Sequence, residues 1–171
     1  DSIYIDKRQI EIFIKNKTIL ITGAAGSIGS ELSRQVAHLK PSLLILLDQD
    51  ETGIFHISEE IKNNFPDLKV KYFVIDIINQ NEIDAIFKEL APKVVYHAAA
   101  YKHVPLMELQ PEEAVRNNIF GTEILASVSL KYNIEKFIFI STDKAVNPTS
   151  VMGATKRIGE MICQIYNQKN H

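Results

Sequence analysis

Several residue types that would signal other kinds of protein are scarce or absent in this sequence. Its 171 residues include one cysteine, Cys163, which excludes an internal disulfide and a cysteine-based zinc site. The sequence suggests no other metal site. The formal net charge is −2, so no basic surface for nucleic acid or anionic lipid is indicated. Without a signal peptide or an apolar run of transmembrane length, we expect a soluble, cytoplasmic segment that has no membrane contact and no nucleic-acid partner.

What is present is typical of one globular domain. Hydrophobic residues make up 46% of the chain and charged residues 23%, and a chain of this length can bury a sizeable core. The chain begins at Asp1 without an initiator methionine. We therefore expect it to be part of a longer protein.

Glycine is also scarce, but three of the seven glycines stand close together after a short apolar run. Residues 19–21 predict a buried strand, and apolar residues at helical spacing from Ile28 onward predict a helix. The three glycines are Gly23, Gly26 and Gly29. A strand, a glycine turn and a helix are together typical of the phosphate-binding start of a dinucleotide fold. Free N–H groups around Ser27 and Ile28 would bind the pyrophosphate; a glycine-rich turn without a ligand is the alternative.

From residue 18 onward, apolar strand patterns alternate with helical patterns. The expected strands cover residues 18–22, 43–47, 70–75, 94–96 and 137–140, and the expected helices cover residues 27–39, 52–64, 80–90, 111–132 and 151–167. Such alternation predicts an α/β domain with a parallel, doubly wound sheet of the Rossmann type and strand order 3-2-1-4-5. Residues 18–171 would form this NAD(P)-binding domain, with ligands at the carboxyl ends of the strands.

Residues 1–17 precede the predicted sheet. Asp6 followed by Gln9 predicts a capped helix start, and the apolar residues of 10–14 form one face. We expect a short helical appendage that packs on the sheet.

Asp48 closes the second expected strand, nineteen residues after Gly29. A carboxylate at this place can accept hydrogen bonds from the two hydroxyls of the adenosine ribose and would repel a 2′-phosphate. NAD is therefore favoured over NADP as the cofactor. The alternative is that Asp48 caps the following helix.

The third and fourth expected strands end in further candidate cofactor residues. Asp76 could reach the amino group of adenine, with the backbone of Ile77 beside it; a turn-forming role for Asp76 is the alternative. The small residues after the fourth strand, which would let the chain pass close to a flat cofactor, are Ala98, Ala99 and Ala100. His97, which precedes them, is expected to be structural.

These segments together resemble the extended short-chain dehydrogenase/reductases. Further marks of that superfamily are the Asn-x-x-Gly-Thr motif at Asn118–Thr122, a hydroxyl residue after the fifth strand, and a helical lysine at Lys156. Within it, residues 98–105 and 141–148 resemble the CapD-type polysaccharide biosynthesis proteins, and the resemblance covers about residues 6–170. These are nucleotide-sugar 4,6-dehydratases, mostly acting on UDP-N-acetylglucosamine with inversion at C5. The resemblance implies a bound NAD, with Asn118 and Lys156 among its contacts, and a UDP-sugar substrate.

The resemblance also implies catalytic roles for residues after the fifth strand. Asp143 would be the acid that protonates the departing C6 hydroxyl, Lys144 the base that takes the C5 proton, and Thr142 the hydroxyl near C4. Lys156 would hold the nicotinamide ribose, and Lys102 would contact the substrate. A solvated ion pair is the alternative for Asp143 and Lys144.

One position departs from the superfamily pattern. Met152 stands where the catalytic tyrosine is usual, four residues before Lys156, and a thioether cannot act as a base. The longer, membrane-tethered members of the family share this methionine. Thr142, or a water relayed to Lys156, would have to take the proton of the C4 hydroxyl.

Two other functions stay open at this point. A nucleotide-sugar 4-epimerase would use the same cofactor without the acid–base pair, and a non-catalytic NAD-binding module would explain Met152. The sequence ends about one helix after Lys156, so we expect truncation before the substrate-binding lobe, with NAD binding but no turnover by this piece alone. The helices at 111–132 and 151–167 are expected to pair in a homodimer or a higher oligomer.

Overall fold

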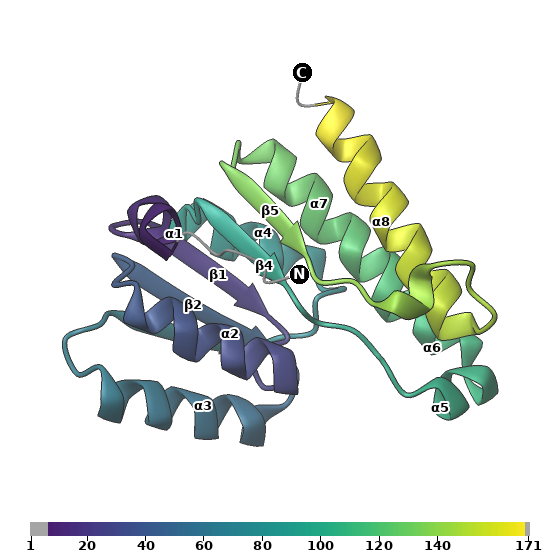
Figure 1. The fold of residues 1–171 in the computed structure, drawn as a ribbon, viewed down its shortest axis with the longest axis horizontal. Helices are drawn as coiled ribbons and strands as arrows, with labels where there is room; N and C mark the ends of the chain where they lie inside the picture. Colours follow the sequence, from purple (N-terminus) through teal and green to yellow (C-terminus); the bar gives the residue numbers. More distant parts are fainter. Residues whose placement is uncertain (1–6, 170–171) are drawn as a thin grey trace.

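A parallel sheet of five strands forms the centre of the chain (Figure 1). The computed structural model describes residues 7–169. The strands are β1 (Thr18–Thr22), β2 (Leu43–Asp48), β3 (Val70–Val74), β4 (Val94–His97) and β5 (Lys136–Phe139). They are hydrogen-bonded in the order β3-β2-β1-β4-β5, and all neighbouring pairs are parallel. The predicted α/β fold and its strand order are confirmed.

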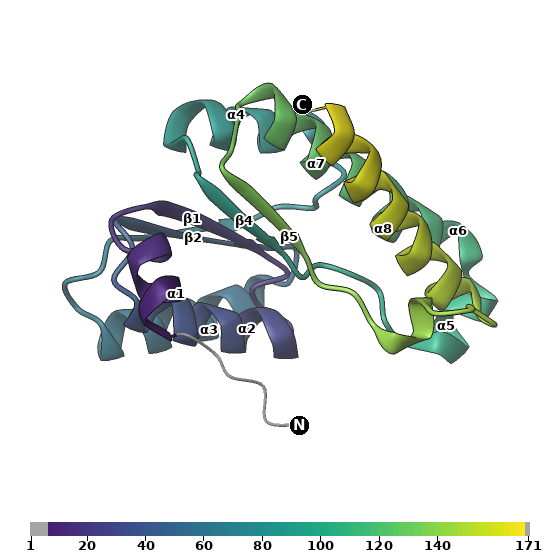
Figure 2. The same ribbon diagram turned by 45° about the horizontal axis from the view of Figure 1, so that its top comes forward.

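Helices cover both faces of the sheet, as Figure 2 shows. One face carries α2 (Ser27–His38) and α3 (Glu51–Asn64), and the other carries α4 (Gln80–Leu90), α7 (Gly121–Lys131) and α8 (Val151–Lys169). The predicted N-terminal helix is α1 (Lys7–Ile14), which packs on the α2 side through the fully buried Ile14. The cap predicted at Asp6 lies outside the described residues.

The apolar strands feed two core clusters because successive side chains of a strand point to opposite faces. Ile19 and Ile21 pack under α2 and α3, and Leu20 packs under α4 and α7. All three side chains are 0% exposed, and burying a side chain of this size contributes about 1.5–3 kcal/mol. These clusters hold the carboxyl ends of the strands, and with them the loops of the site, in fixed positions.

The helix predicted over residues 111–132 is interrupted by a wider turn. It consists of α6 (Pro111–Ala114), the π-helical segment η1 (Val115–Phe120) and α7. A π turn contains one more residue than an α turn, and here the consecutive Asn117 and Asn118 are both buried. Apolar spacing alone does not reveal such a turn.

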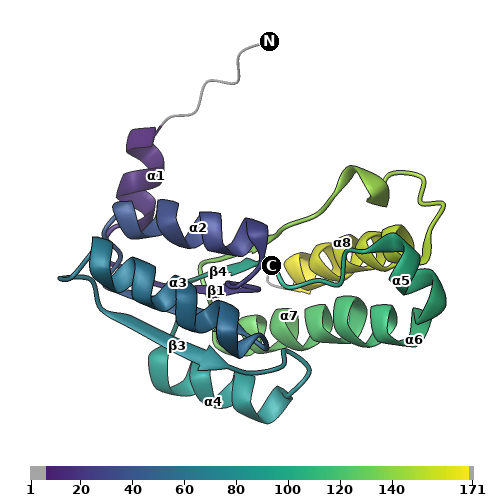
Figure 3. The same cartoon turned by 90° about the horizontal axis from the view of Figure 1, so that it is seen from below.

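Two short elements were not predicted from the sequence. Helix α5 (Val104–Leu109) begins with a proline in its first turn and lies beside the start of α8 (Figure 3). The 3₁₀ turn η2 (Asp143–Ala145) follows β5. Both belong to the loops at the carboxyl ends of the strands, where periodicity is too short to be read.

The surface bears on two further expectations. Within residues 7–169, no helix is both long and apolar enough to cross a membrane. The helices expected to pair between subunits carry half-exposed apolar side chains at Phe120, Met161 and Ile165, which are 52%, 48% and 49% exposed. The oligomer itself stays a prediction.

Candidate cofactor and active site

In the glycine turn after β1 the backbone segments approach each other so closely that a Cβ at Gly23 or Gly29 would clash with backbone atoms. Gly23 has a positive φ of 69°, and a Cβ there would lie 2.4 Å from the backbone nitrogen of Ala99. A Cβ on Gly29 would lie 1.9 Å from the carbonyl oxygen of Gly23, whereas one on Gly26 would meet that oxygen at 3.3 Å. Helix α2 starts after Gly26 without a side-chain cap, which leaves its first N–H groups for a ligand. This cradle fits a pyrophosphate.

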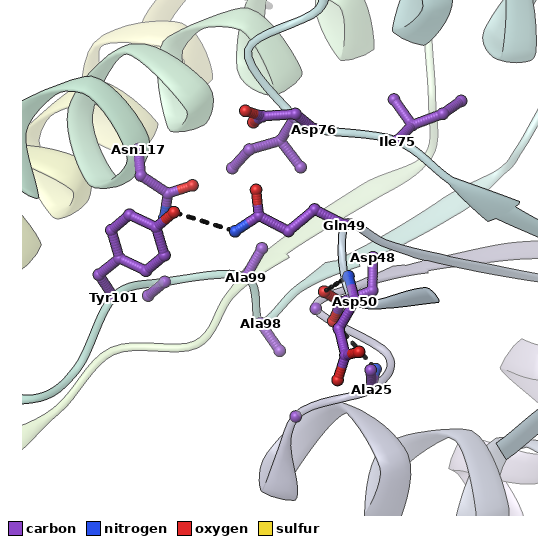
Figure 4. A pocket seen from close by; sticks show the side chains of 14 residues that line it. Ala25, Asp48, Gln49, Asp50, Ile75, Asp76, Ala98, Ala99, Tyr101 and Asn117 are labelled. Atoms are coloured by element: carbon purple, nitrogen blue, oxygen red, sulfur yellow. Dashed lines mark hydrogen bonds between the residues drawn. The ribbon is translucent and has the colours of Figure 1, made fainter. Parts of the chain in front are cut away.

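Beside the glycine turn lies a cavity of about 220 Å³, which we call the glycine-loop cavity (Figure 4). The predicted cofactor residues that line it are Gly23, Gly26, Asp48, Asp76, Ile77, Ala98, Ala99 and Ala100. Residues that line it without having been predicted are Ala25, Gln49, Asp50, Ile75, Tyr101 and Asn117. Gln49 and Asp50 follow Asp48, Tyr101 follows Ala100, and Asn117 precedes Asn118, so nearness in sequence to a predicted residue could have found all four.

The Asp48 carboxylate is fixed at the edge of this cavity. One oxygen accepts a hydrogen bond from the Ala25 N–H at 3.0 Å, and the other accepts one from the Asp50 N–H at 3.1 Å. The cap of α3 is Asp50, whose carboxylate accepts from the Gly53 N–H. Helix capping therefore does not account for Asp48, and each of its oxygens keeps room for another donor.

Asp76 combines a turn contact with an ion pair. Its Oδ1 accepts from the Ile78 N–H at 3.2 Å, and its Oδ2 accepts from Arg116 Nη2 at 2.9 Å. Ile77 is buried and packs so closely on the next layer that a Cβ on Gly121 would lie 2.4 Å from its Cδ1. No local pattern points to Arg116, because the pairing joins positions 40 residues apart.

Gln49 and Tyr101 are joined across the glycine-loop cavity. The Gln49 Nε2 donates to the Tyr101 hydroxyl at 3.0 Å, as the dashed line in Figure 4 shows. The two residues come from the loops after β2 and β4. A ligand in the cavity would lie against this bridge.

His97 is fully buried and lies between two threonines, as expected for a structural histidine. The Thr22 and Thr122 hydroxyls lie 2.7 Å from its Nδ1 and 2.9 Å from its Nε2. Thr122 also donates to the Asn118 carbonyl at 2.7 Å, so Nε2 carries the proton and Nδ1 accepts from Thr22. Burial lowers the pKa of His97 to about 3, with the nearby Lys156 charge acting in the same direction.

Asn118, predicted as a cofactor contact, has a full set of protein partners. Its Nδ2 donates to the Tyr101 carbonyl at 3.0 Å and to Thr155 Oγ1 at 3.1 Å, and its Oδ1 accepts from the Tyr101 N–H at 2.8 Å. The neighbouring Asn117 also donates to that oxygen. Asn118 thus ties the loop after β4 to α8, and its neighbour Asn117 lines the cavity instead.

Lys156 and Met152 both point into the protein from α8. Lys156 is 5% exposed; its Nζ donates to the Ile140 carbonyl at 2.6 Å and lies 3.9 Å from the centre of the Phe139 ring. Burial lowers the pKa of Lys156 to about 8. Met152 is 4% exposed and packs with Met107 in a small apolar cluster. The thioether at this predicted catalytic position therefore fills part of the core.

Asp143 and Lys144 lie exposed on the turn η2. The Thr142 hydroxyl donates to Asp143 Oδ1 at 2.9 Å, and this hydrogen bond, with the charge of Lys144, lowers the pKa of Asp143. The turn rests on α8, since a Cβ on Gly153 would lie 2.3 Å from the Lys144 carbonyl oxygen. The three predicted catalytic residues are thus brought to the helix that carries Lys156.

Lys102 lies near the glycine turn. Its Nζ donates to Ser27 Oγ at 3.4 Å, at the start of α2. This places its charge beside the predicted pyrophosphate position. Its predicted contact with a substrate stays a prediction.

Comparison with known proteins agrees with this architecture. Residues 19–171 match a family model described as "Polysaccharide biosynthesis protein". The capsular polysaccharide biosynthesis protein CapD of Staphylococcus aureus is 47% identical over 99% of this chain and 28% of its own length. A UDP-N-acetylglucosamine 4,6-dehydratase (inverting) of Campylobacter jejuni is 34% identical over 82% of this chain and 40% of its own.

A solved structure shares the fold closely. The UDP-glucose 4-epimerase of Thermotoga maritima, determined with UDP-glucose, superimposes with a TM-score of 0.78 at 26% identity, over 90% of this chain and 52% of that one. The chain thus spans from about a quarter to about half the length of these relatives. Since the family model covers nearly the whole sequence, the chain belongs to the polysaccharide biosynthesis protein family.

Proposed function

We propose that the protein is an NAD-dependent nucleotide-sugar 4,6-dehydratase of surface polysaccharide biosynthesis, with a UDP-N-acetylglucosamine-type substrate. This chain would supply its cofactor-binding part. The observation that carries the proposal is the placement of two features at one end of the sheet. The glycine cradle with Asp48 lies after β1 and β2, and the Thr142–Lys144 turn, packed on α8, lies after β5.

The chain's own groups would bind the cofactor. The cradle at Gly23 and Gly29 admits a pyrophosphate, and Asp48 would accept from the ribose hydroxyls. Lys156 would hold the nicotinamide ribose. Bound NAD would supply the acceptor for the C4 hydride and the donor of that same hydride to C6 once the C6 hydroxyl has left, and a proton returned to C5 would complete the 4-keto-6-deoxy sugar. A larger thermal shift with NAD than with NADP is the expected sign of the Asp48 carboxylate.

The acid–base part of the reaction falls to the turn after β5. With a ketone at C4, the C5 proton becomes acidic, and Lys144 would take it while Asp143 protonates the departing C6 hydroxyl, which leaves as water. Both groups are exposed here, and the pKa of Asp143 is lowered. A proton-donating aspartate and a neutral lysine both require removal from water. The proposal therefore requires that the sugar and the remainder of the protein bury this turn.

Met152 leaves the C4 hydroxyl proton to another group. Thr142 stands beside Asp143, and Lys156 lies one helical turn from Met152. Because burial already lowers the pKa of Lys156 to about 8, that ammonium can release a proton more readily than an exposed lysine. We assign the relay to Thr142 and Lys156, with Met152 as packing only.

A 4-epimerase is the second candidate, because an epimerase named as such, from Rickettsia bellii, is 39% identical over 86% of this chain. The deciding experiment is incubation of the full-length protein with UDP-N-acetylglucosamine and NMR analysis of the product. A 4-keto-6-deoxy sugar nucleotide supports the dehydratase. A C4 epimer with its C6 hydroxyl intact identifies an epimerase, and an unchanged substrate with bound NAD points to a non-catalytic module.

A further inference from the structure

A chain of three charged side chains stands at the far end of the glycine-loop cavity. Arg116, on the π-helical segment η1, donates to Asp76 Oδ2 at 2.9 Å and to a Glu113 carboxylate oxygen at 3.1 Å. The side chains of Asp76, Arg116 and Glu113 are 29%, 41% and 38% exposed. The guanidinium is therefore held between two carboxylates.

Only the aspartate of this group lines the cavity. Asp76 is among the lining residues, whereas Arg116 and Glu113 are not (Figure 4). Arg116 thus acts from behind the carboxylate that a ligand would meet. Each Asp76 oxygen has one protein donor, the Ile78 N–H or the guanidinium. A carboxylate oxygen can accept two hydrogen bonds, so each retains an acceptor position.

Holding both oxygens fixes the direction in which the carboxylate can accept. The Ile78 N–H alone would leave the carboxyl group free to rotate about its terminal torsion, which is a soft one. With Arg116 on the second oxygen, the group has two anchors. A ligand donor must therefore come to the carboxylate, because the carboxylate cannot turn toward the donor.

We propose that Arg116 is a positioning residue that makes this cavity select a 6-amino purine over a 6-oxo purine. The inference rests on the proposed cofactor function. The exocyclic amino group of adenine donates to a fixed acceptor at Asp76. A 6-oxo purine presents an oxygen at the same place, and its nearest donor is the ring N1–H beside it. A fixed carboxylate repels the oxygen, whereas a freed one can turn to the N1–H.

The probe pair is NAD and nicotinamide hypoxanthine dinucleotide, which differ at this purine position. In the full-length protein, calorimetric Kd values should favour NAD by about tenfold or more, since a buried polar group left unpaired costs about 1–3 kcal/mol. Arg116→Met should reduce this ratio to about threefold or less. The loss should come from weaker NAD binding together with unchanged or tighter binding of the hypoxanthine form, and Arg116→Lys should retain part of the ratio.

Two further variants serve as a matched control and as a test of the Asp76 carboxylate itself. Arg34→Met removes an arginine of similar exposure, 40%, that pairs with Glu60 at 2.7 Å on the other face of the sheet, and it should leave the ratio unchanged. Asp76→Asn should abolish the preference, because an amide can present either a donor or an acceptor. If Arg116→Met does not fold, judged by circular dichroism, Arg116→Leu carries the same test, because it likewise has no donor for Asp76.

The outcomes separate the inference from the proposed function. An unchanged ratio in the Arg116 variant overturns the inference, as does a wild-type protein that binds both dinucleotides equally. A wild-type protein that binds neither overturns the cofactor proposal on which the inference rests. Equal weakening of both dinucleotides would reveal a purely structural arginine and would also overturn the positioning role.

Discussion

The glycine-loop cavity and the turn η2 after β5 differ in how firmly their polar groups are held. Around the cavity, Asp48 and Asp76 each accept two hydrogen bonds from the protein. On the turn after β5, Asp143 and Lys144 are exposed, and their contacts come from their immediate neighbours in sequence. The carboxylates of the proposed cofactor site are thus held by this chain, whereas Asp143 and Lys144 lack the buried surroundings that their proposed acid–base chemistry needs.

The sharpest way to test this contrast is Lys144→Ala in the full-length protein. Sugar dehydration should fall by about 10²–10⁴-fold, the usual range for loss of general acid–base catalysis, while NAD affinity stays unchanged. The measurement is the rate of 4-keto product formation together with a calorimetric Kd for NAD. Lys88→Ala, an exposed lysine on α4, is the matched control. Dehydration that survives Lys144→Ala would refute the assignment of the base.

Gly23→Ala tests the other region, the glycine turn beside the glycine-loop cavity. Its positive φ and the 2.4 Å approach to the Ala99 backbone leave no room for a Cβ, and strain of this kind costs on the order of 1–3 kcal/mol before any clash is counted. We expect NAD affinity to fall by about 100-fold. Gly26→Ala is a control for fold stability, since its Cβ would meet only one backbone oxygen of the protein, at 3.3 Å. Equal losses of stability in both variants would contradict the close-approach argument.

A smaller effect concerns His97, which lies between the two regions. Its pKa is about 3 in the folded protein and 6.5 in a free side chain. Between these two pH values the histidine is protonated in the unfolded chain and neutral in the folded one. Stability should therefore fall as the pH drops from about 6.5 toward 3. The slope is half of its limit of about 1.4 kcal/mol per pH unit at pH 6.5 and approaches that limit at lower pH, so the loss between pH 6.5 and 5 is about 1.6 kcal/mol. Denaturant melts across this range, compared with His97→Gln, measure it.

A pH profile that is equally steep in His97→Gln would assign the loss to other groups. The glutamine keeps a donor and an acceptor for the two threonines but cannot titrate in this range. A flattened profile in the variant therefore isolates the imidazole. The comparison requires that both proteins be measured at the same salt concentration, since surface carboxylates titrate over part of the same range.

The sequence was informative where the structure depends on local pattern. The apolar run at 19–21, the glycines that follow and Asp48 at the end of β2 are each recognisable from neighbours, and the sheet order follows from the alternation of elements. The same logic placed the residues after β4 beside the glycine turn. These features rest on short-range geometry or on general rules of parallel sheets.

What escaped prediction depends on contacts between distant segments. The pairing of Arg116 with Asp76 and the bridge from Gln49 to Tyr101 join loops that no periodicity connects. Asn118 is another example. Its motif predicted a cofactor contact, whereas in the structure its amide forms hydrogen bonds with Tyr101 and Thr155. The π turn that buries it cannot be read from apolar spacing.

At Lys156, the stability of the fold and the proposed function favour different side chains. Its buried ammonium contacts the Ile140 carbonyl and the Phe139 ring. These two contacts replace the water molecules that would solvate the charge in an unfolded chain, so burying it costs free energy of folding. Replacing it with methionine should make the protein harder to melt while removing the group assigned to the nicotinamide ribose. A laboratory selection that rewards heat resistance alone would therefore replace this lysine early, whereas a selection that also requires the proposed NAD binding would retain it.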